Sequence, residues 1–165
     1  MKTVVIFVCV SNVCRSPMAE YLFRNMIERE KDRDPRSNEL LDEVVVCSRS
    51  LSTDYEPVNS PASSNGVQIM RDEFGISMDD HRSKLLSEAD IQEATMIVPV
   101  KRDLGRYIEK MFPEAIGKLM YFEKDIEDPW KMPLDVFHAC AMDMSKQLEE
   151  IFQTLVNKLQ ATFEL

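Results

Sequence analysis

The segment that decides the fold is Thr3–Glu30, which reads TVVIFVCVSNVCRSPMAEYLFRNMIERE. Its first seven residues, Thr3–Cys9, are apolar and rich in β-branched side chains, which predicts a buried strand. After a short polar turn, apolar residues such as Met18 and Leu22 recur at helical spacing, and Pro17 suits the first position of a helix. The segment therefore predicts a strand, a tight turn and a helix.

The same alternation of strands and helices continues along the chain. The further predicted strands are Glu43–Ser48, Thr95–Val100 and Lys118–Phe122. Helical patterns run from near Ser60 to a stop before Gly75, over Asp103–Phe112 and over Pro133–Gln160. We expect an α/β fold in a single domain, residues 1–165, with three α/β/α layers around a central four-stranded parallel sheet.

One segment between these elements is predicted to be a loop. Lys31–Asn38 is rich in charged residues and contains a proline, so we expect a solvated loop.

Composition and charge exclude several classes of protein. The net charge of −9 argues against a nucleic-acid partner, which normally requires a basic face. The apolar run Val4–Val10 is too short to cross a bilayer and is followed by no small-residue cleavage site, so neither a membrane segment nor a signal peptide is expected. Four cysteines are sparse, and Cys9 and Cys14 lack the spacing of a zinc site. We expect reduced thiols in a cytoplasmic protein.

The turn between the first strand and the first helix has the chemistry of an anion site. Ligands of open parallel sheets bind beyond the carboxyl ends of the strands, where a curled loop and a helix start aim their N–H groups. Five residues separate Cys9 from Arg15, which lets the loop circle a tetrahedral oxyanion and return the guanidinium to it. Cys9 at the strand end would then be a thiolate facing a bound phosphorus. Ser16 is either the helix cap or a hydroxyl that hydrogen-bonds this thiolate.

The sequence FVCVSNVCRSPMAE, residues 7–20, resembles the active-site loop of the low-molecular-weight protein tyrosine phosphatases. The resemblance implies hydrolysis of phosphotyrosine through a cysteinyl-phosphate intermediate, without metal or cofactor, in a monomer or weak homodimer. Its ligands would be phosphotyrosine-containing proteins and phosphate or other oxyanions. It implies Cys9 as nucleophile and Arg15 as oxyanion clamp. The phosphate-binding residues implied by it are Val10, Ser11, Asn12, Val13, Cys14 and Ser16.

A general acid must protonate the leaving oxygen when a thiolate attacks phosphorus. Asp128 stands in IEDPWKMP, and although Asp-Pro alone is usually a turn, here it resembles the acid loop of the same family. Trp130 would then be an apolar wall for an aryl ring. Tyr55 matches a second family aromatic; its alternative is a loop aromatic packed on the surface.

Three polar residues match family positions that hold the phosphate loop in shape: Asn12, Ser48 and His81. Asn12 suits a turn position of positive φ, and the alternative for His81 is a helix-cap or surface histidine. Ser11 departs from the pattern, because a glycine is common there. Two further departures concern lysines. Lys101 stands where the family commonly has Met-Asp followed by a polar run, and Lys131 stands where a second aromatic is frequent.

Some alternatives stay open from the sequence. Cys14 is either a small buried filler or the partner of Cys9 in a reversible protective disulfide. A related arsenate reductase would need resolving cysteines between Phe74 and Gln92, where none occurs. A phosphoarginine phosphatase would be expected to carry a hydroxyl where Val13 stands. The remaining alternative is a catalytically silent phosphate-binding module.

Overall fold

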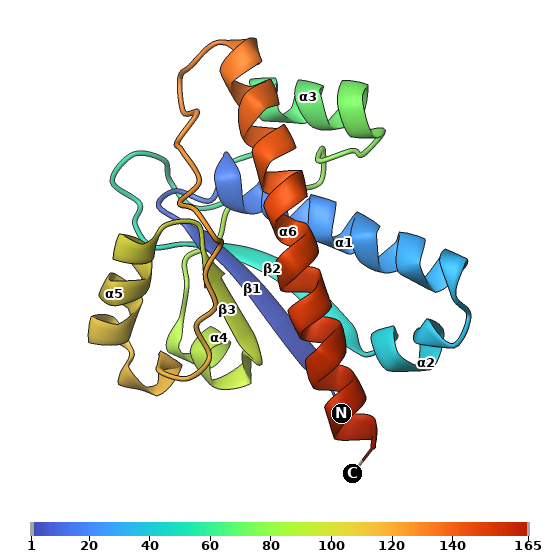
Figure 1. Ribbon diagram of the computed structural model, residues 1–165. Helices are drawn as coiled ribbons and strands as arrows, with labels where there is room; N and C mark the ends of the chain where they lie inside the picture. The colour runs from blue at the N-terminus through green and yellow to red at the C-terminus, as the bar shows by residue number, and fades with distance from the viewer. Residues whose placement is uncertain (1, 165) are drawn as a thin grey trace.

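The computed structural model describes residues 2–164. Figure 1 shows a central sheet with helices on both of its faces and a long last helix, α6, that reaches past the sheet. In chain order the elements are β1 (Thr3–Cys9), α1 (Arg15–Arg33), α2 (Ser37–Leu41), β2 (Val44–Ser50), α3 (Ser64–Phe74), α4 (Glu88–Glu93), β3 (Met96–Pro99), α5 (Arg102–Met111), the 3-10 turn η1 (Pro113–Ala115) and α6 (Leu134–Phe163).

The sheet has three parallel strands in the order β2-β1-β3. The middle strand, β1, is buried along its whole length, as its continuous apolar sequence predicts. Cys9 pairs with Ser50 of β2, and Val8 pairs with Pro99 of β3. These pairings bring the carboxyl ends of all three strands to one edge of the sheet, beside the start of α1.

The predicted fourth strand, Lys118–Phe122, is wrong as a strand. It meets β3 at a single bridge, in which Ile97 donates its N–H to the carbonyl of Lys118 and accepts the N–H of Met120. Along β3, every second residue points its N–H and carbonyl toward the Lys118–Phe122 segment. After Ile97, the next residue to donate a hydrogen bond to this segment would therefore be Pro99. Proline has no N–H, and the ladder therefore stops after one step.

The two faces of β1 pack into two separate hydrophobic cores. One core lies under α1, α3 and α6, and the other lies under α4 and α5, which gives the expected α/β/α layers (Figure 1). Side chains of β1 alternate between these cores because successive residues of a strand point to opposite faces. Val5, Phe7 and Cys9 face the first core, and Val4, Ile6 and Val8 face the second.

The four main predicted helices are confirmed as α1, α3, α5 and α6. Helix α3 begins at Ser64, a little later than expected, and ends at Phe74. Gly75 caps it, with a φ of 66° in the left-handed region that suits a C-terminal cap. Helix α4 was not predicted, although Ser87 and Asp90 form a capping box at its start.

The predicted loop Lys31–Asn38 is mostly wrong. Helix α1 continues to Arg33, and α2 begins at Ser37. Two ion pairs stabilise the charged end of α1. Lys31 Nζ lies 2.9 Å from a carboxylate oxygen of Asp42, and Arg33 pairs with Glu30, one turn earlier in the helix. Only a short break around the proline remains of the expected loop.

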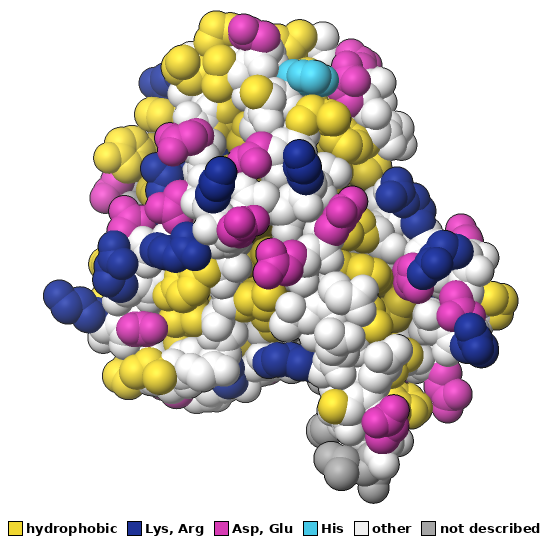
Figure 2. All heavy atoms as spheres, viewed as in Figure 1, with side chains coloured by type: hydrophobic (Ala, Val, Ile, Leu, Met, Phe, Trp, Pro, Cys, Tyr) yellow, Lys and Arg dark blue, Asp and Glu magenta, His cyan; other side chains and the backbone are white. Residues whose placement is uncertain are grey.

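The surface carries both signs of charge. On the face covered by α6, acidic and basic side chains are interspersed, as Figure 2 shows. No helix within residues 2–164 has a stretch long and apolar enough to cross a membrane.

Candidate active site

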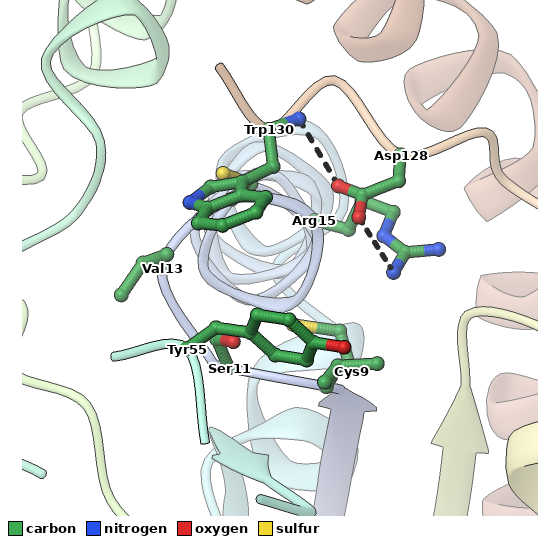
Figure 3. A pocket seen from close by; sticks show the side chains of 9 residues that line it. Cys9, Ser11, Val13, Arg15, Tyr55, Asp128 and Trp130 are labelled. Carbon is green, nitrogen blue, oxygen red and sulfur yellow. Dashed lines mark hydrogen bonds and ion pairs between the residues drawn. The ribbon is translucent and has the colours of Figure 1, made fainter. Parts of the chain in front are cut away.

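The loop between β1 and α1 forms the floor of a pocket of about 290 Å³ at the carboxyl edge of the sheet (Figure 3). Strand β1 ends at Cys9 and helix α1 begins at Arg15, so the five residues between them make the whole turn. The lining residues are Cys9, Val10, Ser11, Val13, Cys14, Arg15, Tyr55, Asp128 and Trp130. The pocket thus contains residues from both predicted motifs and from the loop after β2.

Two groups of the loop and helix α1 form hydrogen bonds with the sulfur of Cys9. The backbone N–H of Asn12 donates to Sγ at 3.2 Å, and Ser16 Oγ lies 2.9 Å from Sγ. Asn12 Nδ2 donates to Ser16 Oγ at 2.8 Å, which leaves the hydroxyl hydrogen of Ser16 free to point at the sulfur. Both groups are hydrogen-bond partners of the sulfur, and the start of α1 lies nearby.

Asn12 shapes the loop from inside. Its φ is 61°, which confirms the expected positive φ, and it is fully buried. Its side chain donates to Ser48 Oγ at 2.8 Å and accepts the backbone N–H of Lys84 at 3.0 Å. Among residues 2–164 Ser11 is not one of the positive-φ positions, so the missing glycine leaves no strain in that angle.

His81 supports the same turn through its ring. Nε2 lies 2.8 Å from the carbonyl oxygen of Asn12, and this contact requires that Nε2 carries the proton. Burial lowers the pKa of His81, which keeps the imidazole neutral at ordinary pH. The surface alternative for His81 is wrong, because its side chain is buried against the loop.

The sequence reasoning missed Glu20, a buried carboxylate beneath the loop. Ser48 Oγ donates to Glu20 Oε1 at 2.6 Å, and the other oxygen pairs with Arg24 at 2.6 Å. Ser16, Glu20 and Arg24 are spaced by four residues and therefore share one face of α1. That spacing is the signal that could have revealed this polar chain from Arg24 to the Cys9 sulfur.

Arg15 and Asp128 lie next to each other on one side of the pocket. Arg15 is buried, and one of its terminal nitrogens donates to the carbonyl of Ile126 at 3.0 Å. The other lies 3.6 Å from Asp128 Oδ2, as Figure 3 shows. Asp128 Oδ1 accepts the backbone N–H of Trp130 at 3.1 Å, while its side chain stays 46% exposed. The acid loop is therefore tied to the phosphate loop and open to solvent.

Two aromatic side chains wall the opening. The rings of Tyr55 and Trp130 meet edge to face with centroids 5.5 Å apart. Trp130 Nε1 donates to Glu56 at 3.4 Å, and Lys131 Nζ lies 4.4 Å from the centre of the same ring. Lys131 stands where the family resemblance implies a second aromatic side chain, and its cation packs on the ring of Trp130.

Cys14 lies in the wall of the pocket but is not exposed. Its Sγ lies 2.9 Å from Ser63 Oγ, on the N-terminal side of α3. Burial raises the pKa of the Cys14 thiol to about 12, so it is protonated at neutral pH. The structure places it as a packed thiol within the loop.

The structure brings all the candidate residues into one region. Those not lining the pocket lie directly beneath it as hydrogen-bond partners of the loop: Asn12, Ser16, Ser48 and His81. Within residues 2–164, the backbone N–H groups of Ser11, Val13 and Cys14 donate to no protein acceptor, which suits an oxyanion above the loop.

Comparison with known proteins identifies the group to which this site belongs. The family described as low molecular weight phosphotyrosine protein phosphatase matches residues 4–161. The chain is 31% identical to a protein-arginine-phosphatase of Geobacillus stearothermophilus, covering 94% of this chain and 95% of that one. It is 25% identical to a low molecular weight protein-tyrosine-phosphatase of Acinetobacter johnsonii, covering 87% and 96%.

A solved structure agrees with these sequence matches. The low molecular weight protein tyrosine phosphatase of T. tengcongensis superposes with a TM-score of 0.76 at 30% identity, covering 93% of this chain and 99% of that one. The family match over residues 4–161 includes both the loop of Cys9 and the loop of Asp128. The chain belongs to the low molecular weight phosphotyrosine protein phosphatase family, whose members are hydrolases.

Proposed function

We propose that this protein hydrolyses phosphotyrosine in proteins, and small aryl phosphates, through a phosphoenzyme on Cys9. The observation that carries the proposal is that one pocket brings together a nucleophile, a buried cation and a half-exposed acid: Cys9, Arg15 and Asp128. Both hydrophobic cores pack on the same sheet, which supports one phosphatase domain over residues 1–165.

In the first half-reaction the Cys9 thiolate attacks phosphorus and the bond to the aryl oxygen breaks. Arg15 and the free N–H groups of the loop stabilise the charge on the equatorial oxygens. Asp128 gives its proton to the departing oxygen, so a phenol leaves and Asp128 becomes a carboxylate. The contact between Arg15 and Asp128 positions the acid beside the reacting atoms.

In the second half-reaction a water molecule attacks the phosphocysteine. Asp128 now takes a proton from this water, the sulfur–phosphorus bond breaks and inorganic phosphate leaves. Ser16 and the Asn12 amide stabilise the sulfur as it departs with its electron pair. The chemistry requires no metal at any step.

The walls of the pocket favour an aryl substrate. Val10 and Val13 are apolar, and Tyr55 and Trp130 offer ring faces and edges to a phenyl group. A phosphoarginine would bring polar guanidinium N–H groups past Val13, which has no hydrogen-bond acceptor in its side chain. We therefore propose phosphotyrosine as the substrate, although two of the relatives are named protein-arginine-phosphatases.

The test is turnover of p-nitrophenyl phosphate, phosphotyrosine peptides and phosphoarginine peptides by the purified protein. We expect turnover of the two aryl substrates, strong inhibition by vanadate as a mimic of five-coordinate phosphorus, and no effect of a chelator. Preferred hydrolysis of phosphoarginine would contradict the substrate assignment. No turnover of any of the three would instead indicate a silent phosphate-binding module.

Oxidation should reveal what Cys14 does. Hydrogen peroxide converts the Cys9 thiolate to a sulfenic acid, and a Cys14 thiolate can attack this sulfur, expel hydroxide and form a disulfide. Because the pKa of Cys14 is raised to about 12, its thiolate fraction grows about tenfold per pH unit between about pH 7 and about pH 9. We expect dithiothreitol to rescue the parent better than Cys14→Ala, by a margin that grows with pH.

The measurement is the activity regained after peroxide and dithiothreitol, as a fraction of the untreated activity of each protein. If the parent and Cys14→Ala regain equal fractions of their activity at about pH 7 and at about pH 9, Cys14 only fills space.

A further inference from the structure

A second groove adjoins the active-site pocket and has no part in the chemistry described above. It lies between the loop after β2 and helix α5, two segments that lie on the same side of the sheet edge in Figure 1. Its volume is about 680 Å³, more than twice that of the catalytic pocket. A groove of this size can hold a whole side chain and part of the backbone that carries it.

The groove continues directly from the catalytic pocket. Val10 and Tyr55 line both, so Tyr55 forms the ridge between them. Any chain that places a phosphorylated side chain over Cys9 must lay its neighbouring residues over the rim, and the groove begins at this rim. It is therefore placed to contact the residues beside the phosphorylated one.

Part of the groove lining is apolar and exposed, beside the polar side chains of Ser52 and Thr53. Tyr55, Leu85 and Tyr107, which are 62%, 43% and 47% exposed, are among the exposed large hydrophobic side chains, and Leu51 and Leu104 also line the groove. Three such side chains in one hollow form an apolar surface that a bound side chain would cover. Two of them are tyrosines, whose ring faces attract cations.

The charged residues of the groove are all acidic. Asp54 and Asp103 line it from opposite sides, one from the loop and one from the first turn of α5, and no lysine or arginine lines it. Within residues 2–164, neither carboxylate is part of an ion pair. The nearby Arg102 is turned away, pairing with Asp125.

We propose that this groove binds an arginine or lysine side chain next to the phosphotyrosine of the substrate. The proposal rests on the proposed function and deepens it by naming the substrate class. The methylene stem of such a side chain packs on Leu85 and Leu104, its cation lies against Tyr107, and its charge meets Asp54 and Asp103. A glutamate in the same place meets two uncompensated carboxylates and is rejected.

The experiment is kcat/KM for a series of phosphotyrosine peptides with alanine at all flanking positions. Arginine, norleucine or glutamate then replaces alanine at each flanking position in turn. At one position or more we expect arginine to raise kcat/KM about 10-fold, norleucine to raise it less and glutamate to lower it. The arginine effect should shrink as salt is added, because the two carboxylates are exposed.

The variant that tests the groove is the double change Asp54→Asn and Asp103→Asn. It should remove most of the arginine preference, retain the norleucine effect and leave p-nitrophenyl phosphate turnover unchanged. The matched control is Asp32→Asn with Glu114→Gln, which removes the same charge from exposed sites outside the groove and should keep the preference.

The outcomes separate this inference from the proposed function. Normal phosphotyrosine turnover without an arginine preference, or a preference that survives in the groove variant, overturns the groove and leaves the function intact. A loss of preference in the control variant as well assigns the effect to net charge and also overturns the groove. Absence of phosphotyrosine turnover in the parent overturns both.

Discussion

Cys9→Ser should lower turnover of p-nitrophenyl phosphate by at least about 10⁴-fold, because it removes the sulfur that attacks phosphorus in the proposed mechanism. A serine hydroxyl is protonated at neutral pH and is a much weaker nucleophile than a thiolate. Phosphate binding should survive, since Arg15 and the loop amides remain in place. Steady-state kinetics measures the first effect, and calorimetric titration with inorganic phosphate measures the second.

Cys47→Ser is the matched control for this change. Cys47 lies on β2 against the other core, away from the pocket, and the substitution alters the same atom. It should leave turnover within about twofold of the parent. A Cys9→Ser protein that still turns over substrate would reject the phosphocysteine mechanism, and one that no longer binds phosphate would mean that the sulfur also shapes the loop.

Much of the site was predictable because its central part is contiguous in sequence. The spacing from Cys9 to Ser16 fixes which groups surround an anion, and no tertiary contact is needed to expect them together. Tyr55 and Asp128 stand on distant loops, so only the family resemblance suggested that they would meet the same pocket. Glu20 was missed because nothing in the sequence distinguishes this buried glutamate from the exposed glutamates of the same charged helix.

The fold shows the same division between local and tertiary causes. Strand β1 has the bounds that its apolar run predicts, since its burial follows from its own sequence. The expected fourth strand failed because its partner, β3, presents Pro99 where a donor is needed. The loop predicted at Lys31–Asn38 failed because an ion pair to Asp42, which periodicity cannot show, stabilises the helix end.

Asp128→Asn should lower kcat about 10²- to 10³-fold for substrates with poor leaving groups and far less for p-nitrophenyl phosphate. Asparagine keeps the shape of the side chain and can still accept the Trp130 N–H, but it has no proton to give. A nitrophenolate leaves without protonation, whereas an unsubstituted phenolate or a tyrosinate does not. The measurement is kcat across a series of aryl phosphates whose leaving groups differ in basicity.

Glu127→Gln, the neighbouring carboxylate in the same loop, is the control, because it removes one charge without removing a group that lines the pocket. Its dependence on the leaving group should match that of the parent. For Asp128→Asn, kcat should depend much more steeply on the basicity of the leaving group, since the leaving oxygen then departs unprotonated and must carry the negative charge itself. An equal loss for good and poor leaving groups would show that Asp128 acts by holding Arg15 in place, 3.6 Å away, instead of by moving a proton.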